Sequence, residues 1–408
     1  MQVEEVCQYN VQNNKLHSVE KDDYPADLKD DIKIIAKSEG FVKYNVKVKK
    51  LPVDGGNYMA ELYEIDISGI TTEGEKEINI FAKQINLGSG TLESVVNISE
   101  LFKLEKFAYK ELYQVFNEIQ ENAKVPADER YRMVKCYDSN PGAILMANLR
   151  KQGYKTYSRI DVVSLDFAEK AIKNLAKFHA LSFAMENIKP DFFDCKIKTL
   201  NCPLSFGEEL RSLQKSLFSI AMSNLDYDLR NRVKDNIFNK LCKYRDYFEK
   251  PEISWLCHGD YRVMNMMIRD VDGKIEDLIA LDYQIINYGN PLKDLIYFIF
   301  TATDRKFRKS HLSYLKDTYY KQLEYFLKYF DLDVDHSLPR EKFERIYEET
   351  LDYGLIIMIT IAPFMFADEG DVPDVANVSM SSLDFKVDDA YKNYLRDIVE
   401  DFIDWGYL

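Results

Sequence analysis

Apolar and polar residues alternate in three runs between about residues 41 and 85, which is the pattern of half-buried strands. The first two runs flank a polar turn at 54–57, so we expect a hairpin there. The third run, 78–82, ends in Lys83. These runs predict a small, mainly antiparallel sheet in which one strand carries a lysine at its end.

The spacing becomes helical from about 96 to 122, where apolar residues recur every three or four positions. A further hairpin is expected from 133–137 and 143–146. Beyond Asn148 the pattern is mostly helical, with helices expected at 165–185, 206–224, 226–249, 310–330 and 339–362. The predicted class is therefore α+β, with a β-rich lobe followed by a larger helical lobe.

The segment 265–282 interrupts the helical part. Two apolar runs flank Asp272 and Gly273, and an Asp-Gly pair between such runs predicts a tight hairpin. Asn265 begins the first strand, and Asp282 follows the end of the second. Because the open ends of a hairpin lie together, these two side chains can share one metal ion, with Asp260 within reach in the preceding loop.

This constellation suits ATP-dependent phosphoryl transfer, in which a carboxylate takes the proton of the attacking hydroxyl and oxygen ligands hold Mg²⁺. Asp260 is the candidate base, and Asn265 and Asp282 are the candidate metal ligands. An isolated His-Gly-Asp is more often a turn with an aspartate cap. The asparagine, the hairpin and the second aspartate together favour the functional interpretation.

A nucleotide also needs a cation near its phosphates, and Lys83 is the candidate, with Glu105 as its partner. Each residue alone is more often a solvated surface residue, and it is their order along the chain that favours the functional interpretation. Gly55, Gly56 and Asn57 could cover the phosphates with backbone N–H groups, although a simple hairpin turn explains them equally well.

Composition and charge argue against several classes of protein. The chain has 408 residues, of which 46% are hydrophobic and 30% charged, so it is expected to form two globular lobes. A net charge of -14 argues against nucleic-acid or anionic-membrane binding. Without an apolar run of about 20 residues or a signal-like N-terminus, we expect no membrane insertion and a cytoplasmic location. The six cysteines and five histidines lack metal-ligand spacing.

Several motifs resemble the ecdysteroid kinase-like family, within the choline kinase and aminoglycoside phosphotransferase group that shares the protein-kinase-like fold. The resemblance spans roughly residues 40–370. It is carried by Phe102, Glu105 and Tyr109, by 175–182, by Cys257, His258, Gly259, Asp260 and Asn265, by Asp282, Tyr283 and Gln284, and by 288–291 with Asp294 and Leu295.

The resemblance implies an N-lobe at 1–145, a hinge at 146–150 and a helical C-lobe at 151–408. It gives Asp260, Asn265, Asp282, Lys83 and Glu105 the roles stated above, with ATP and Mg²⁺ as cofactors. Met146 and Asn148 fall where the hinge of the family meets adenine through its backbone. By the same resemblance, Asp294 anchors the catalytic loop, and His258 orients that loop by hydrogen bonding.

Gly259 stands where protein kinases commonly carry an arginine that reads a phosphorylated activation loop. That difference, and the short gap from Asp282 to Asp294, favour a small-molecule kinase over a protein kinase. Arg262 and Met264 stand where many relatives carry Trp and Asn, which leaves the substrate open. His179, on the apolar face of its helix, is expected to be a core histidine.

The acceptor is expected to be a small, lipophilic alcohol such as an ecdysteroid. The segment 353–366 is apolar on every side, so a buried helix is the favoured interpretation, and a helix with one face lining a pocket is the alternative. A choline kinase would instead need an aromatic and acidic cage. A catalytically silent protein that binds a hydrophobic ligand is the other alternative, and the oligomeric state stays open.

Overall fold

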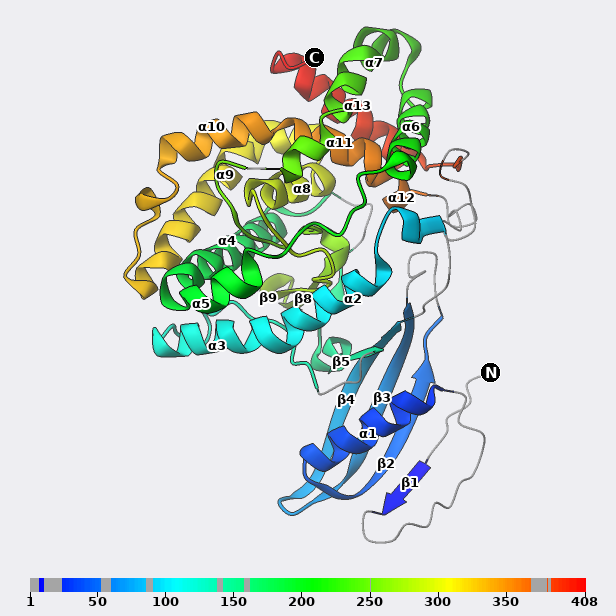
Figure 1. Ribbon diagram of the computed structural model, residues 1–408, viewed down its shortest axis with the longest axis vertical. Coiled ribbons are helices and arrows are strands. Elements are labelled where there is room, and N and C mark those ends of the chain that lie inside the picture. The colour runs from blue at the N-terminus through cyan, green and yellow to red at the C-terminus, as the bar shows by residue number, and fades with distance from the viewer. Residues whose placement is uncertain are drawn as a thin grey trace. The chain divides into compact units, whose positions relative to one another are not determined.

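The computed structural model describes residues 7–10, 24–52, 60–85, 91–137, 142–157, 162–249, 251–367, 380 and 383–408. The chain divides into two compact units (Figure 1). The first comprises Met1–Gly88 and Val134–Lys155, and the second comprises Ser89–Met133 and Thr156–Leu408. The first unit is a sheet with a helix, and the second is mainly helical, so the predicted α+β class is confirmed.

The first unit contains an antiparallel sheet with the strand order β1-β2-β3-β4-β5. Its strands are β1 (Cys7–Asn10), β2 (Phe41–Lys50), β3 (Ala60–Thr71), β4 (Gly74–Ile85) and β5 (Ala143–Ala147). The three strands predicted between 41 and 85 are confirmed. The turn at 54–57, with Gly55, Gly56 and Asn57, lies outside the described residues.

Helix α1 (Ala26–Ser38) lies along this sheet (Figure 1). Its residues Leu28, Ile32 and Ile35 are buried at helical spacing and join one core with the inward-facing side chains of the sheet. The hydrophobic stripe of the helix is thus covered by the apolar face of the strands, which is the usual way such a layer becomes stable.

The second unit contains the remaining helices and several short strands. The helices are α2 (Ile98–Phe107), α3 (Tyr113–Asn122), α4 (Leu165–Ile188), α5 (Pro190–Phe192), α6 (Glu208–Ser223), α7 (Tyr227–Leu241), α8 (Leu292–Ala302), α9 (Arg305–Leu327), α10 (Arg340–Thr350), α11 (Asp352–Thr360), α12 (Ala362–Met365) and α13 (Asp389–Asp404). Strand β7 (Trp255–Cys257) pairs with β10 (Asn287–Gly289), and β8 (Met266–Val271) pairs with β9 (Lys274–Ala280). The two-residue strand β6 (Lys155–Thr156) lies at the boundary between the units.

The predicted hairpin at 265–282 is confirmed. Its turn residues Asp272 and Gly273 both have positive φ, 52° and 79°, which is the backbone geometry that an Asp-Gly hairpin turn requires. The helix predicted at 96–122 is present but is interrupted by a π-helical turn, Ala108–Leu112. The one predicted at 339–362 is divided among α10, α11 and the start of α12.

Residues 89–133 belong to the second unit and not to the unit that contains the sheet, which differs from the predicted N-lobe at 1–145. The physical reason is packing on α4. Phe116 of α3 and Tyr131 both contact Phe178 of α4, with ring centroids 5.8 and 5.5 Å apart. Contacts of this kind bury large rings, and they place 89–133 with the helical unit.

The apolar segment at 353–366 contains α11, which is buried along its length, as predicted. It approaches α8 closely, because a Cβ placed on Gly354 would lie 2.6 Å from the ring of Phe300. Glycine is therefore needed at this crossing. Among the described helices, none combines the length and the apolar character needed to cross a membrane. The cytoplasmic location stays a prediction.

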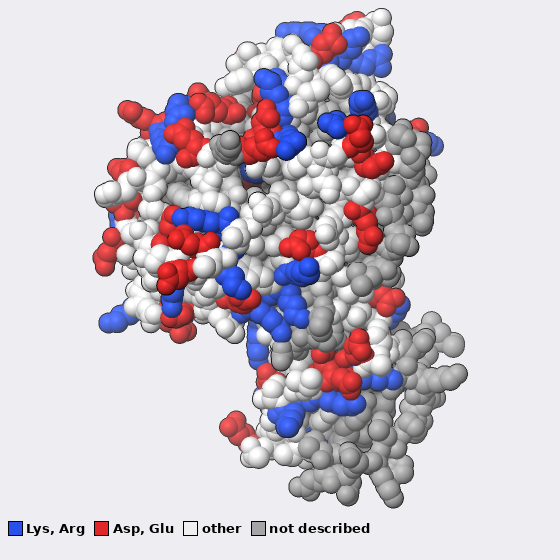
Figure 2. Space-filling view, in the orientation of Figure 1, with Lys and Arg blue, Asp and Glu red and all other residues white. Residues whose placement is uncertain are grey.

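Charged side chains of both signs are interspersed over the face shown in Figure 2.

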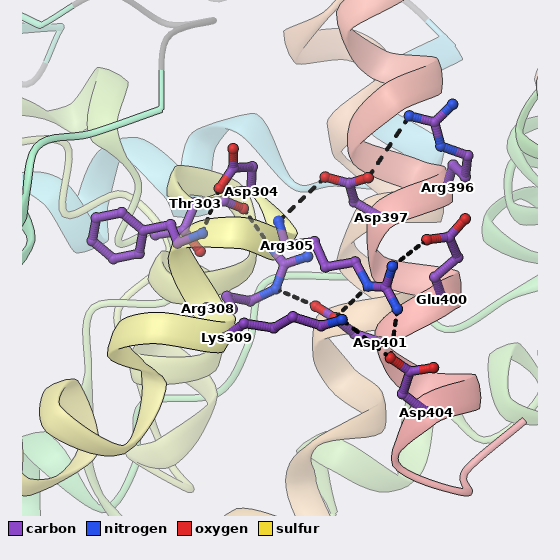
Figure 3. A network of polar contacts seen from close by, with 11 residues as sticks. Thr303, Asp304, Arg305, Arg308, Lys309, Arg396, Asp397, Glu400, Asp401 and Asp404 are labelled. Atoms are coloured by element: carbon purple, nitrogen blue, oxygen red, sulfur yellow. Dashed lines mark hydrogen bonds and ion pairs between the residues drawn. The ribbon is translucent and has the colours of Figure 1, made fainter.

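Helix α13 is held by one network of charges (Figure 3). Arg305, at the start of α9, is paired with Glu400, Asp401 and Asp404. Asp401 also accepts a hydrogen bond from Arg308 at 2.7 Å, and both of these side chains are almost fully buried.

We expect Asp401→Ala to lower the free energy of unfolding of the second unit by about 3–5 kcal/mol, because it leaves the buried guanidinium of Arg308 without its carboxylate. Asp404→Ala, which removes a half-exposed carboxylate from the same network, should cause a much smaller loss, because solvent screens exposed ion pairs. Denaturant unfolding followed by circular dichroism measures both, and equal losses would contradict this account of the network.

Candidate active site

The loop that carries Asp260 is held by one carboxylate. Asp294, in the first turn of α8, accepts hydrogen bonds from the backbone N–H groups of His258 at 2.6 Å and Gly259 at 3.0 Å. These two residues follow directly after β7. The anchoring role expected for Asp294 thus agrees with the structure, and it fixes the backbone on the N-terminal side of Asp260.

Helix α4 supports this anchor from behind. His179 Nε2 lies 3.2 Å from Asp294 Oδ2, and its Nδ1 lies 2.8 Å from the hydroxyl of Tyr319. Ser182 Oγ accepts a hydrogen bond from the backbone N–H of Leu256 at 2.7 Å. The motif at 175–182 is therefore a scaffold for the loop. His179 is fully buried with both ring nitrogens in contact, so it is a core histidine, as predicted.

Burial alone raises the pKa of Asp294. The hydrogen bond and charge of His179, with a smaller contribution from His258, outweigh that effect and hold the pKa below its ordinary value. The carboxylate is therefore ionised and accepts all of these hydrogen bonds.

The expectation that His258 orients the loop by hydrogen bonding agrees with its backbone, whose N–H donates to Asp294. Both of its ring nitrogens are buried. The ring instead packs against Tyr283 and Tyr261, with centroids 4.8 and 5.4 Å away. Burial lowers the pKa of this histidine, so the neutral form is favoured. Its backbone N–H takes part in holding the loop.

Gly259 is required by the local geometry. Its φ is 83°, and a Cβ at this position would lie 2.3 Å from the carbonyl oxygen of Ile285. Both the left-handed backbone and the close approach exclude a side chain. The absence of the arginine found in protein kinases therefore has a structural cause as well as a functional interpretation.

Asp260 is nearly buried, and both of its carboxylate oxygens have partners. Asn265 Nδ2 donates to Oδ2 at 2.8 Å, and the hydroxyl of Tyr297 donates to Oδ1 at 2.6 Å. Arg262 Nε lies 3.1 Å from the same Oδ1. Burial, and then the charge of Asp260, raise the pKa of Tyr297 well above its ordinary value. The hydroxyl is therefore protonated and serves as the hydrogen-bond donor to Asp260.

The predicted metal ligands meet beside this carboxylate. Leu281 donates its backbone N–H to the carbonyl of Asn265 at 2.8 Å, which places Asn265 next to the start of Asp282. Asp282 has a positive φ of 67°, an uncommon conformation for a residue other than glycine. Its backbone N–H is held at 3.2 Å by the hydroxyl of Tyr109, which lies in the π-helical turn. Such turns are often found at functional sites.

The residues present are compatible with a magnesium ion. The amide nitrogen of Asn265 is taken up by Asp260, so its Oδ1 faces away and has no hydrogen-bond donor among the described residues. Carboxylate and amide oxygens are suitable ligands for Mg²⁺, which takes few protein ligands and keeps waters or phosphates for the rest. No group of three or more acidic, histidine or cysteine side chains forms an alternative metal site in the described residues.

The other predicted nucleotide contacts lie in different units, and each is described within its own. Lys83 is half-buried in β4, opposite Leu62 and Ile144. Glu105 is buried in α2. Their pairing stays a prediction.

At the expected hinge, Met146 lies in β5, and Asn148 donates its backbone N–H to the carbonyl of Asn79 at 2.9 Å. The side chain of Asn148 accepts from the N–H of Arg150 at 3.1 Å and caps a short 3₁₀-helix, Leu149–Gln152. These contacts fix the chain at 146–150, and the contact with adenine stays a prediction.

A cavity of about 270 Å³ opens beside Asp260 within the second unit. Its polar lining includes Asp260, Arg262, Lys293 and Tyr297. Its apolar lining includes Tyr244, Phe248, Tyr353, Ile357, Ile361 and Phe364. Four of these six residues come from the segment 353–366, so this buried helical region also lines the pocket with one face.

Sequence reasoning missed Tyr297 and Lys293. Both lie in α8 with Asp294, and a signal for Tyr297 was present. Residues three apart share one face of a helix, so the residue three positions after the loop anchor faces the same loop. Lys293 had no such signal, because nothing in the sequence indicates that a lysine in a first helical turn is buried.

An α+β chain with a carboxylate, an amide and a second carboxylate gathered beside a cavity has the arrangement of a small-molecule kinase, and this is the class of the protein. The chain belongs to the ecdysteroid kinase-like family, whose pattern it matches over residues 54–332. No curated protein matched the sequence.

Solved structures similar to this chain include the choline kinase LicA from Streptococcus pneumoniae, with 15% identity, a TM-score of 0.41 and coverage of 92% of this chain and 99% of that one. The Plasmodium vivax ethanolamine kinase has 12% identity, a TM-score of 0.39 and coverage of 88% and 83%. The streptomycin–ATP complex of APH(2")-IIa has 15% identity, a TM-score of 0.38 and coverage of 83% and 92%. Because the identities and TM-scores are this low, we assign the class of the protein from the family match and not from these structures.

We expect Gly259→Ala to destabilise the second unit by about 1–3 kcal/mol more than Gly273→Ala. Both glycines have positive φ, but a Cβ at Gly273 would meet nothing within 4 Å. The comparison of unfolding midpoints therefore separates backbone strain from the contact with Ile285. A loss no larger than that of Gly273→Ala would mean that the loop relaxes freely.

Asp294→Asn should lower the free energy of unfolding by about 2–4 kcal/mol at neutral pH, since an amide cannot accept from both backbone N–H groups and His179. The folded pKa of Asp294 is lowered, so its contribution is present above the unfolded pKa of about 4 and is lost as the pH falls through the lower folded value. Denaturant unfolding at several pH values should show wild type and variant converging in acid. A constant difference down to pH 2 would contradict the assignment.

Proposed function

We propose that this protein transfers the γ-phosphoryl group of ATP, with Mg²⁺, to a hydroxyl of a small molecule bound in the cavity beside Asp260. The observation that carries the proposal is the position of Asp260, which lines the cavity and also contacts Asn265 and Tyr297. A candidate base, one candidate metal side chain and space for an acceptor are thus close together, which supports the proposal.

In this mechanism Asp260 accepts the proton of the acceptor hydroxyl as its oxygen attacks the γ-phosphorus, and the bond to ADP breaks. Tyr297 and Asn265 hold the carboxylate in one orientation, which positions it for the transfer. Bound Mg²⁺ would neutralise charge on the phosphates. Asn265 and Asp282 would supply its protein oxygens, and Lys83 with Glu105 would hold the phosphates. Gly55, Gly56 and Asn57 would cover the phosphates, and Met146 and Asn148 would meet adenine.

The cavity supports an acceptor with a partly apolar body. Ile357, Ile361 and Phe364 form a wall of the cavity, and an ecdysteroid is the acceptor that the family description suggests. The volume of about 270 Å³ lies just below the range of roughly 300–1,000 Å³ usual for drug-sized ligands. A compact acceptor, or one that extends partly beyond the cavity, suits this size.

A quaternary ammonium such as choline is disfavoured by the residues around the rings. The ammonium of Lys293 lies 3.9 Å from the ring centre of Phe248 and 5.8 Å from that of Tyr353. It therefore occupies the aromatic face that a choline cage would offer. Arg262 adds a second cation to the same lining.

Incubation of the protein with ATP, Mg²⁺ and a panel of ecdysteroids, other alcohols, choline and an aminoglycoside should give a phosphorylated product detectable by mass spectrometry. Asp260→Asn should lower the rate by at least about 100-fold, because it removes the proton acceptor. The matched control is Asp272→Asn, an exposed aspartate in the hairpin turn, which should keep full activity.

A product formed equally by Asp260→Asn would overturn the assignment of the base. If ATP with Mg²⁺ leaves the melting temperature unchanged while an apolar ligand raises it, the protein is instead a silent binding protein of kinase fold.

A further inference from the structure

Lys293 is a buried cation in the candidate acceptor cavity. Only 3% of the residue is exposed, and it lies in the first turn of α8. Within the described part of the chain its ammonium takes part in no hydrogen bond or ion pair, and it lies over the rings of Phe248 and Tyr353. A buried ammonium is unfavourable without an anion, and the positive end of a helix adds to the cost.

The two carboxylates that line the same cavity are already engaged. Asp294 accepts from two backbone N–H groups and contacts His179. Asp260 accepts from Tyr297 and Asn265 and is paired with Arg262. Neither carboxylate is within ion-pair distance of Lys293. Its charge is therefore the one that the described cavity lining leaves uncompensated.

We propose that Lys293 binds an oxyanion of the acceptor, such as a carboxylate or a sulfate, while a hydroxyl of the same molecule faces Asp260. This inference rests on the proposed function and narrows its substrate class to an acidic alcohol with an apolar or aromatic body. The rings of Phe248 and Tyr353 contact the ammonium itself, and an oxyanion in the cavity would supply the negative charge that the rings lack. A neutral steroid would fill the apolar wall without compensating this charge.

Binding tests the proposal without any need for turnover. Benzoate and benzamide have nearly the same shape and differ in charge, and both are small enough for the cavity. Benzoate should bind the wild-type protein about 10- to 100-fold more tightly than benzamide, as expected for one charged hydrogen bond. Titration calorimetry measures both affinities, and equal affinity of the two would overturn the proposal without any mutation.

Lys293→Met keeps an unbranched side chain against the two rings and removes the charge. It should abolish the preference for benzoate, and Lys293→Arg should keep part of it. Lys316→Met is the matched control, because that lysine also faces a ring, Tyr347 at 4.5 Å, but does not line the cavity. A benzoate preference that survives in Lys293→Met would contradict the proposal. If this variant fails to fold, the wild-type comparison and Lys293→Arg still decide.

Turnover separates this inference from the proposed function. With 4-(hydroxymethyl)benzoate and its methyl ester as acceptors, the acid should have the lower KM in wild type, and Lys293→Met should raise that KM about 10- to 100-fold with a smaller change in kcat. Phosphorylation of neutral alcohols that is insensitive to Lys293→Met would support the kinase and overturn the oxyanion site. Benzoate binding that depends on Lys293, with no phosphorylation of any alcohol, would support the site and overturn the kinase.

Discussion

The carboxylate of Asp294 is the interaction on which the candidate site depends. It accepts two backbone N–H groups of the loop and contacts His179, so it joins α8, the loop and α4 at one point. Burial would favour its neutral form, and only these donors keep it charged. The anchor holds the N–H of the left-handed Gly259 and so fixes the backbone that leads into Asp260.

Helix α8 contributes more than the anchor. Within its first two turns, Asp294 faces the loop, Tyr297 donates to Asp260, and Lys293 lines the cavity. A single rigid helix thus relates loop, base and acceptor space to one another. This is an economical way to hold a reacting group in place, because rigid elements fix side chains better than loops do.

Electrostatics in the cavity distinguish among possible acceptors more than its apolar wall does. An apolar wall accepts many molecules with similar free energies, since burial depends on area and not on direction. An uncompensated ammonium discriminates by charge, because burial strengthens every interaction that it makes. Arg262 pairs with Asp260 and also lines the cavity, so a second cation lies in the same part of the cavity.

Much of the site could be predicted because its signals are local. The Asp272-Gly273 turn, the strand on each side and the order of Asp260, Asn265 and Asp282 depend on near neighbours in the sequence, and the structure has them as predicted. The role of Asp294 came from resemblance to a family. The packing of the His258 ring among aromatic side chains could not be predicted, because burial of this kind has no local signal.

The sequence by itself determined the α+β class, the hairpin, the buried apolar segment and the residue types needed for phosphoryl transfer. These features could be predicted because backbone conformation and hydrophobic periodicity depend on residues close together in the chain. Only the tertiary structure decided which distant groups meet. The hydroxyl of Tyr109 holds the N–H of Asp282 across 173 positions, and Lys293 faces a cavity whose wall comes from α11 and α12. Such contacts depend on how helices pack, and packing joins residues that no spacing in the sequence connects.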